Sequence, residues 1–136
     1  MPFVNHKLLL ERPLQIIQMT LAALWIYQGL IPKILFQSAA EIAIWQSLGL
    51  EPHLAKIGVA LSGIIEMMFG CSFLLWQKAV VIHQLNILGL SGLLLLIILT
   101  NPLQLTTAFN PVVMNIAMIA LSILAIQLLK LSQQSS

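Results

Sequence analysis

The sequence has few charged residues, the residues that normally keep a globular protein in solution. Only 7% of its 136 residues are charged, and none of them is aspartate, whereas about 25% is usual for a soluble domain. Hydrophobic residues make up 60%, against roughly 45–50% in soluble domains. Too few charges remain to cover a water-facing surface. The composition therefore excludes a disordered chain and argues strongly against a soluble globule.

Cysteine is nearly absent, and the excess of basic residues is small. The single cysteine, Cys71, excludes a disulfide framework and a dithiol redox centre of the CxxC kind within this chain. Six Lys and Arg residues against four Glu give a net charge of +2. So small a charge, spread along the whole chain, forms no phosphate-binding stripe, so nucleic acid is excluded as a partner.

Long apolar runs, in contrast, are abundant. A transmembrane helix needs about 20 predominantly apolar residues, and we assign four such spans to residues 14–36, 54–76, 79–100 and 112–131. Pro13 is expected at the start of the first helix, where a missing N–H costs nothing. The sequence thus predicts an all-α membrane protein, with four transmembrane helices forming one domain over residues 1–136.

The segment between the first two spans, residues 37–53, has a different pattern. Ile42, Trp45 and Leu48 follow one another at intervals of three residues, and the polar Glu41 lies off that stripe. This spacing indicates a short amphipathic helix lying at the membrane interface. An ordinary ordered loop is the alternative.

The basic residues divide unequally between the two sides of the predicted bundle, which sets its orientation. Cytoplasmic loops of membrane proteins are enriched in Lys and Arg. One side carries Lys7, Arg12, Lys78 and Lys130, and the other carries Lys33 and Lys56. We therefore expect both termini in the cytoplasm.

Glu66 is the acidic residue inside a predicted span. Counted at 1.5 Å per residue from the basic boundary, it lies about 16–18 Å deep, close to the bilayer midplane. An acid there costs about 2.5–3.5 kcal/mol to insert, so it is a candidate functional residue. The alternative is a neutral acid that only hydrogen-bonds two helices together.

The same count of depths suggests partners for Glu66. Asn86 and Ser122 fall near 12 Å, whereas Lys33 falls roughly 15 Å beyond Glu66. We therefore expect Asn86 as the direct partner and no ion pair with Lys33. Without a cation at its level, burial should keep Glu66 at least partly protonated at neutral pH. Gly63 shares its helix face, which favours an acid facing protein, with the second and third spans packed closely around it.

Pro32 interrupts the end of the first span. Because proline lacks an N–H and its ring clashes with the carbonyl of Gln28, we expect a kink or break near Gly29. The freed carbonyl, Gln28 and Asn115 would then meet at one level, about 22–24 Å from the cytoplasmic side. The alternative is that Pro32 ends the span and Lys33 extends to the headgroups.

Histidines are too dispersed to suggest a metal or haem site. His6 and His53 are expected at opposite faces of the membrane, so neither converges with His83. A haem or a metal cofactor is therefore not expected. The sequence also contains no nucleophile–base triad or phosphate-binding loop, so we expect no autonomous catalytic activity.

Three motifs and one acid carry a family resemblance. WIYQGLIPK (residues 25–33), Glu41, GIIEMMFG (residues 63–70) and FNPVVMN (residues 109–115) resemble, in order and spacing, the DoxX-like family of small bacterial membrane proteins. The resemblance implies four transmembrane helices, a multi-pass location in the bacterial inner membrane and a link to redox systems. Since this chain lacks paired cysteines, an oxidoreductase activity is not carried over.

These observations favour a protein that binds a small apolar or quinone-like molecule between its helices, as an accessory subunit of a membrane redox system. A small-solute or proton-coupled transporter, or a purely structural membrane partner, are the alternatives. Expected partners are the lipid bilayer, a redox subunit and further copies of the chain. The expected ligand-binding residues are Trp25, Gln28, Lys33, Glu66, Asn86 and Asn115.

Overall fold

The computed structural model describes residues 6–108 and 110–134, and this part of the chain is built from helices without strands. Its α-helices are α1 (His6–Gly29), α2 (Ala39–Ser47), α3 (Pro52–Leu75), α4 (Val80–Thr100) and α5 (Pro111–Gln134). A π-helix, η1 (Leu30–Leu35), continues α1, and a 3-10 helix, η2 (Pro102–Thr106), follows α4. Phe109 of the FNPVVMN motif and the side chain of Lys7 lie outside the described residues.

Four segments are long and apolar enough to cross a membrane, as predicted. They are Leu8–Leu35, Pro52–Leu75, Val80–Thr100 and Pro111–Gln134. The prediction that the first helix starts at Pro13 is wrong. The helix already begins at His6, and Pro13 lies inside it. The residues before Pro13 are mostly leucine and charged residues with high helix propensity, which outweighs the one backbone hydrogen bond lost there.

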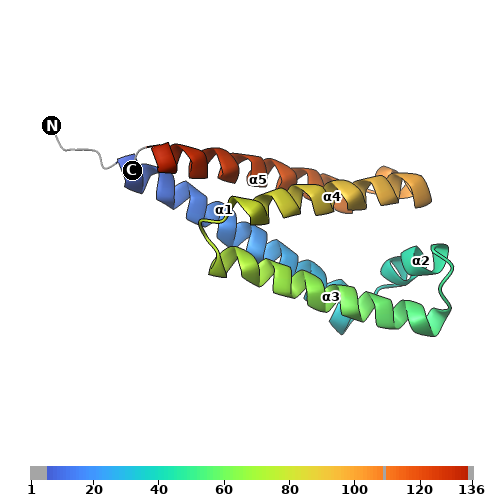
Figure 1. Cartoon of the computed structure of the whole chain (residues 1–136). Coiled ribbons are helices and arrows are strands. Elements are labelled where there is room, and N and C mark those ends of the chain that lie inside the picture. The colour runs from blue at the N-terminus through green and yellow to red at the C-terminus, as the bar shows by residue number, and fades with distance from the viewer. Residues whose placement is uncertain (1–5, 109, 135–136) are drawn as a thin grey trace.

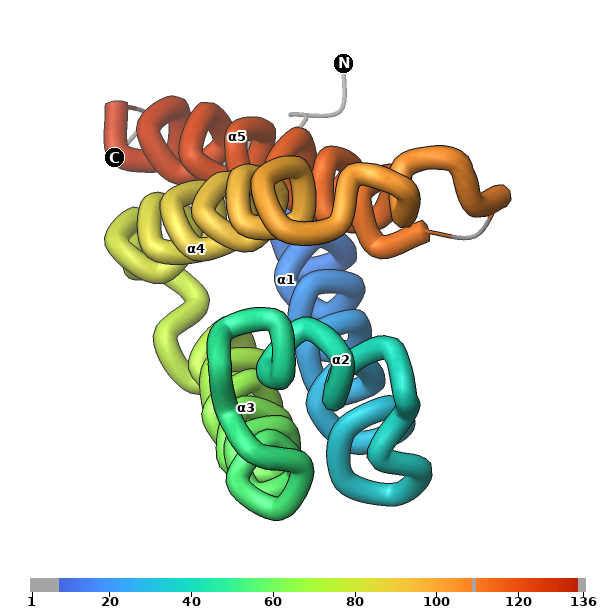
Figure 2. Tube along the Cα trace, turned by 90° about the vertical axis from the view of Figure 1, so that its right-hand side faces the viewer, coloured from blue at the N-terminus to red at the C-terminus, as the bar shows by residue number. Residues whose placement is uncertain are grey.

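The spans form two pairs that diverge toward one end of the molecule. α1 packs along α3 and α4 packs along α5, while α1 also contacts α5. Figure 1 shows the pairs meeting where α1 begins and α5 ends, and separating toward the end that carries α2. Figure 2, viewed at right angles, shows the α4–α5 pair above the α1–α3 pair. The helices thus form a wedge whose wide end faces α2.

The short helix between the first two spans is confirmed, and it lies on α3. Ser38 caps α2 by accepting a hydrogen bond from the backbone N–H of Glu41 at 3.3 Å. The helix ends before Gly49, whose φ of +91° suits glycine. Its Trp45 ring covers Gly58 so closely that a Cβ there would lie 2.8 Å from the ring. A tryptophan against a glycine therefore holds α2 on the N-terminal part of α3.

Small residues bring α1 and α3 into backbone contact. A Cβ on Gly63 would lie 2.7 Å from the carbonyl oxygen of Gly29, and one on Gly70 would lie 3.0 Å from the carbonyl oxygen of Ala22. The expected close approach of the second and third spans around Glu66 is therefore wrong, because α3 uses this face for α1. On α4, a Cβ on Gly89 or Gly92 would have nothing within 4 Å.

Candidate ligand-binding pocket

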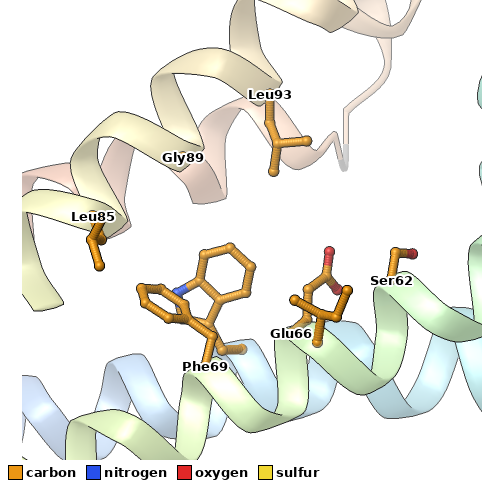
Figure 3. Close-up of a pocket in the computed structure, with 8 residues that line it drawn as sticks. Ser62, Glu66, Phe69, Leu85, Gly89 and Leu93 are labelled. Carbon is orange, nitrogen blue, oxygen red and sulfur yellow. The ribbon is translucent and has the colours of Figure 1, made fainter.

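A pocket with a volume of about 450 Å³ lies between α1, α3 and α4, inside the wedge. Figure 3 shows the side chains of α3 facing α4 across this space, with the carboxyl group of Glu66 pointing into it. Most of the lining is apolar, and the polar side chains are those of one tryptophan, one serine and one glutamate. The lining residues are Trp25, Ser62, Ile65, Glu66, Phe69, Leu85, Gly89 and Leu93.

Glu66 has a cationic partner, which corrects the expectation from the sequence. The Nζ atom of Lys33 lies 2.5 Å from its Oε1 atom. Both side chains are largely buried, with 11% and 12% of their surface exposed. A partly neutral Glu66 was expected because no cation was assigned to its level, and that premise is wrong. A buried carboxylate at this distance from an ammonium group forms a charge-assisted hydrogen bond.

Lys33 was expected too far from Glu66 because the depth count assumed that the basic ends of α1 and α3 lie at the same depth in the membrane. The structure aligns Gly63 with Gly29, and a Cβ on Gly63 would lie 2.9 Å from the Cβ of Lys33. Lys33 therefore begins one helical turn from Glu66 instead of three. A lysine side chain spans such a gap easily.

The kink or break predicted near Gly29 is also wrong, because the helix continues there as a π-helix. The helix does not open at Pro32; it widens into the π-helix η1, in which the N–H of Phe36 donates to the carbonyl of Ile31 at 3.1 Å. A π-helix adds one residue to the turn and so rotates the residues that follow it. This change of register lies at the position of Lys33, which faces Glu66.

Lys33 also contacts a second carboxylate, which belongs to α2. Its Nζ atom lies 3.5 Å from Oε2 of Glu41, a side chain that is 28% exposed. One ammonium group thus links two carboxyl groups from different helices. The Oε2 atom of Glu66 is buried and accepts no hydrogen bond from any described residue.

Asn86 forms hydrogen bonds with Trp25 and Ser122 instead of with Glu66, the partner expected from the sequence. Its Oδ1 atom accepts a 2.7 Å hydrogen bond from Nε1 of Trp25, and its Nδ2 atom donates to Oγ of Ser122 at 2.7 Å. The same Nδ2 lies 3.4 Å from the carbonyl of Met118. Nδ1 of His83 lies 3.3 Å from Oγ of Ser122. The predicted common level of Asn86 and Ser122 is confirmed, but the expected direct pairing of Asn86 with Glu66 is wrong.

This network fixes the tryptophan that forms one wall of the pocket. Trp25 is 6% exposed and packs edge-to-face on Phe69, with ring centroids 5.1 Å apart and an interplanar angle of 88°. Asn86 is fully buried and is not a lining residue. Its side chain therefore orients the indole, whose ring then borders the pocket.

We expect Asn86→Leu to lower the free energy of unfolding by about 1–3 kcal/mol, since the indole N–H and the Ser122 hydroxyl lose a buried partner. The measurement is denaturant unfolding in detergent micelles, followed by circular dichroism. Gln84→Leu is the matched control, because Gln84 is an exposed amide on the same helix. Equal effects of the two substitutions would contradict a special role for the Asn86 network.

Gln28 lies at the contact of α1 with α5, and both Gln28 and Asn115 lie outside the pocket lining. Nε2 of Gln28 lies 3.9 Å from the sulfur of Met114, the neighbour of Asn115. Asn115 is 3% exposed, and its Oδ1 atom has no partner among the described residues. Of the six residues expected to bind a ligand, the structure places Trp25 and Glu66 on the pocket surface.

Most of the apolar lining and the role of Glu41 were not predicted from the sequence. Phe69 follows Glu66 by three residues, as expected for one helix face, and this spacing was the available signal. Gly89 also lines the pocket, and a Cβ there would have nothing within 4 Å. Nothing in the spacing of Glu41 indicates that its helix folds back toward Lys33.

Comparison with known proteins identifies a family for this chain. Residues 22–123 match the model of the DoxX-like family. The matched segment begins in α1 and ends in α5, so it contains every residue of the pocket lining. No curated protein and no solved structure matches the chain.

Proposed function

The chain belongs to the DoxX-like family, and from this membership and the pocket at Glu66 we propose that it is a membrane protein that binds a small, largely apolar molecule between α1, α3 and α4. The observation that carries the proposal is a mostly apolar pocket that contains one buried, partly unpaired carboxylate. Ligand sites in helix bundles combine an apolar lining with a few polar groups that fix orientation.

The size and walls of the pocket support this function. A volume of about 450 Å³ lies within the roughly 300–1,000 Å³ range of small-molecule sites. Trp25 and Phe69 pack against each other as an aromatic wall of the pocket. Leu85 and Leu93 lie across the space from Phe69 (Figure 3). A flat or ring-bearing apolar molecule fits these surfaces, with its polar end at Glu66.

The residues have distinct roles in this proposal. Trp25 and Glu66 contact the ligand, whereas Lys33 and Asn86 are positioning residues that hold those two side chains through an ion pair and a hydrogen bond. Gln28 and Asn115 remain candidates for a second polar contact near the outer end of α1, where Asn115 has an unpaired oxygen.

Within the same proposal, the ligand has a quinone-like ring and the protein serves a membrane redox system as an accessory subunit. We also propose a location in the bacterial inner membrane with both termini in the cytoplasm. Supporting this orientation, the start of α1 and the end of α5 lie at the same end of the bundle (Figure 1), and the predicted division of basic residues favours that end as cytoplasmic.

Filling the pocket should remove a co-purified ligand. Gly89 lines the pocket and has free space around it, so Gly89→Leu places a side chain into the cavity without a backbone clash. Gly92→Leu is the matched control, since Gly92 also has free space but is not a lining residue. Mass spectrometry of gently extracted protein should detect a small molecule bound to the native chain and to the Gly92→Leu protein. The Gly89→Leu protein should carry at least about tenfold less of this molecule than either of them.

Equal amounts of every small molecule in the three preparations would contradict the pocket as a binding site. A structural partner without a ligand would then be the better interpretation. Circular dichroism of all three proteins provides the control for folding.

A further inference from the structure

The polar groups around the pocket offer hydrogen-bond acceptors but no free donor. Nε1–H of Trp25 is already donated to Asn86 at 2.7 Å. The hydroxyl of Ser62 is donated to the carbonyl of Val59 at 2.8 Å, which leaves its oxygen lone pairs. Glu66 as a carboxylate has no hydrogen to give. These are the polar side chains among the lining residues.

The acceptor that most needs a donor is the second oxygen of Glu66. Oε1 receives the ammonium group of Lys33, but Oε2 is buried and receives nothing from any described residue. Nζ of Lys33 bonds Oε1 of Glu66 and lies 3.5 Å from Oε2 of Glu41, and it makes no hydrogen bond to Oε2 of Glu66. Buried polar atoms almost always have a partner, so this oxygen indicates that a donor from outside the described chain belongs here.

We infer that the pocket recognises a neutral hydroxyl group on an apolar, ring-bearing molecule, as in a phenol, a hydroquinone or an alcohol, and discriminates against the corresponding quinone, ketone or ether. The inference rests on the proposed function and specifies its ligand chemistry. A hydroxyl group donates one hydrogen bond, and a bond from O–H to a carboxylate is short and strong. A carbonyl or an ether brings only another acceptor to the carboxylate. If the ligand is quinone-like, its reduced form is the one bound.

A charged amine fits this arrangement less well than a hydroxyl group does. An ammonium group is strongly hydrated and has three hydrogens to place, whereas the lining offers Oε2 of Glu66 and Oγ of Ser62. Lys33 already lies 2.5 Å from the same carboxylate, so a second cation there would be repelled by the first. The neutral donor satisfies Oε2 without adding charge.

The test compares two ligands that differ only in the donor: a ring-brominated para-hexylphenol and its methyl ether. In a Trp45→Phe/Trp76→Phe background Trp25 is the remaining tryptophan of the three in the chain, and bromine quenches its fluorescence on contact. We expect saturable quenching by the phenol in lipid nanodiscs, with the ether binding on the order of tenfold more weakly because it leaves Oε2 unpaired. In the same background, the Gly89→Leu protein has a filled pocket, so its quenching measures the contribution of ligand that is only dissolved in the bilayer.

Each outcome has a separate meaning. Saturable binding of the ether as tight as that of the phenol would overturn the hydroxyl inference and leave the pocket in place. Quenching by both compounds no greater than with Gly89→Leu would overturn the proposed function as well. Tighter binding of the matching para-hexylbenzylamine would overturn the preference for a neutral donor.

A substitution at Glu66 provides a second test on the protein side. Glu66→Gln keeps one acceptor and adds an N–H donor, so the ether gains a partner and its disadvantage should shrink to about threefold or less. Unchanged discrimination in a folded Glu66→Gln protein would show that another group selects the hydroxyl. The comparison of phenol with ether on native Glu66 stands even if this variant does not fold.

Discussion

Replacing Lys33 with methionine should lower the free energy of unfolding by about 3–5 kcal/mol, the cost of leaving one partner of a buried ion pair alone. Lys33 and Glu66 are 11% and 12% exposed and lie 2.5 Å apart, so water compensates little of the loss. The contact with Glu41, at 3.5 Å, is lost as well and releases α2 from its tie to η1. Equilibrium unfolding in mixed micelles, followed by circular dichroism, provides the measurement.

Two further variants separate the ion pair from general effects of the substitution. Lys56→Met makes the same change at an exposed position of α3 and should alter stability by less than about 0.5 kcal/mol. Lys33→Met/Glu66→Met replaces the whole pair with apolar side chains and should recover most of the loss. A double variant as unstable as the single one would mean that packing of the lysine stem, and not its charge, stabilises this region.

The fold was predictable because the membrane places strong demands on length and polarity. Four runs of about 20 apolar residues leave few architectures other than four spanning helices. The spacing of apolar and polar residues around Trp45 indicated the short helix α2, with an ordered loop as the alternative. Counting along neighbouring helices also placed Asn86 level with Ser122, and their side chains are 2.7 Å apart.

The site was less predictable because it depends on how helices shift along one another. The pairing of Lys33 with Glu66 follows from the backbone contact of Gly29 with Gly63 and from the π-helix at Pro32. Neither can be obtained from residue counts, since each depends on which faces meet. The pocket depends likewise on α4 diverging from α3, which leaves Gly89 uncovered.

Gly63→Ala should destabilise the protein by about 1–3 kcal/mol, although alanine is the better helix former by about 1 kcal/mol. The new methyl group would lie 2.7 Å from the carbonyl oxygen of Gly29 and 2.9 Å from Cβ of Lys33. The first neighbour is backbone, so α1 has to move away from α3 to relieve the contact. That movement also carries Lys33 away from Glu66, and the loss should be measurable by the same unfolding titration.

Gly92→Ala is the matched control for this prediction, because it makes the same change in a helix where the new methyl group meets nothing within 4 Å. It should leave stability unchanged or raise it by up to about 1 kcal/mol through helix propensity alone. Combining Gly63→Ala with Lys33→Met should then cost less than the sum of the two, because α1 has already moved and weakened the ion pair. Strict additivity would mean that the Gly29–Gly63 contact does not set the position of Lys33, and that some other contact brings Lys33 to Glu66.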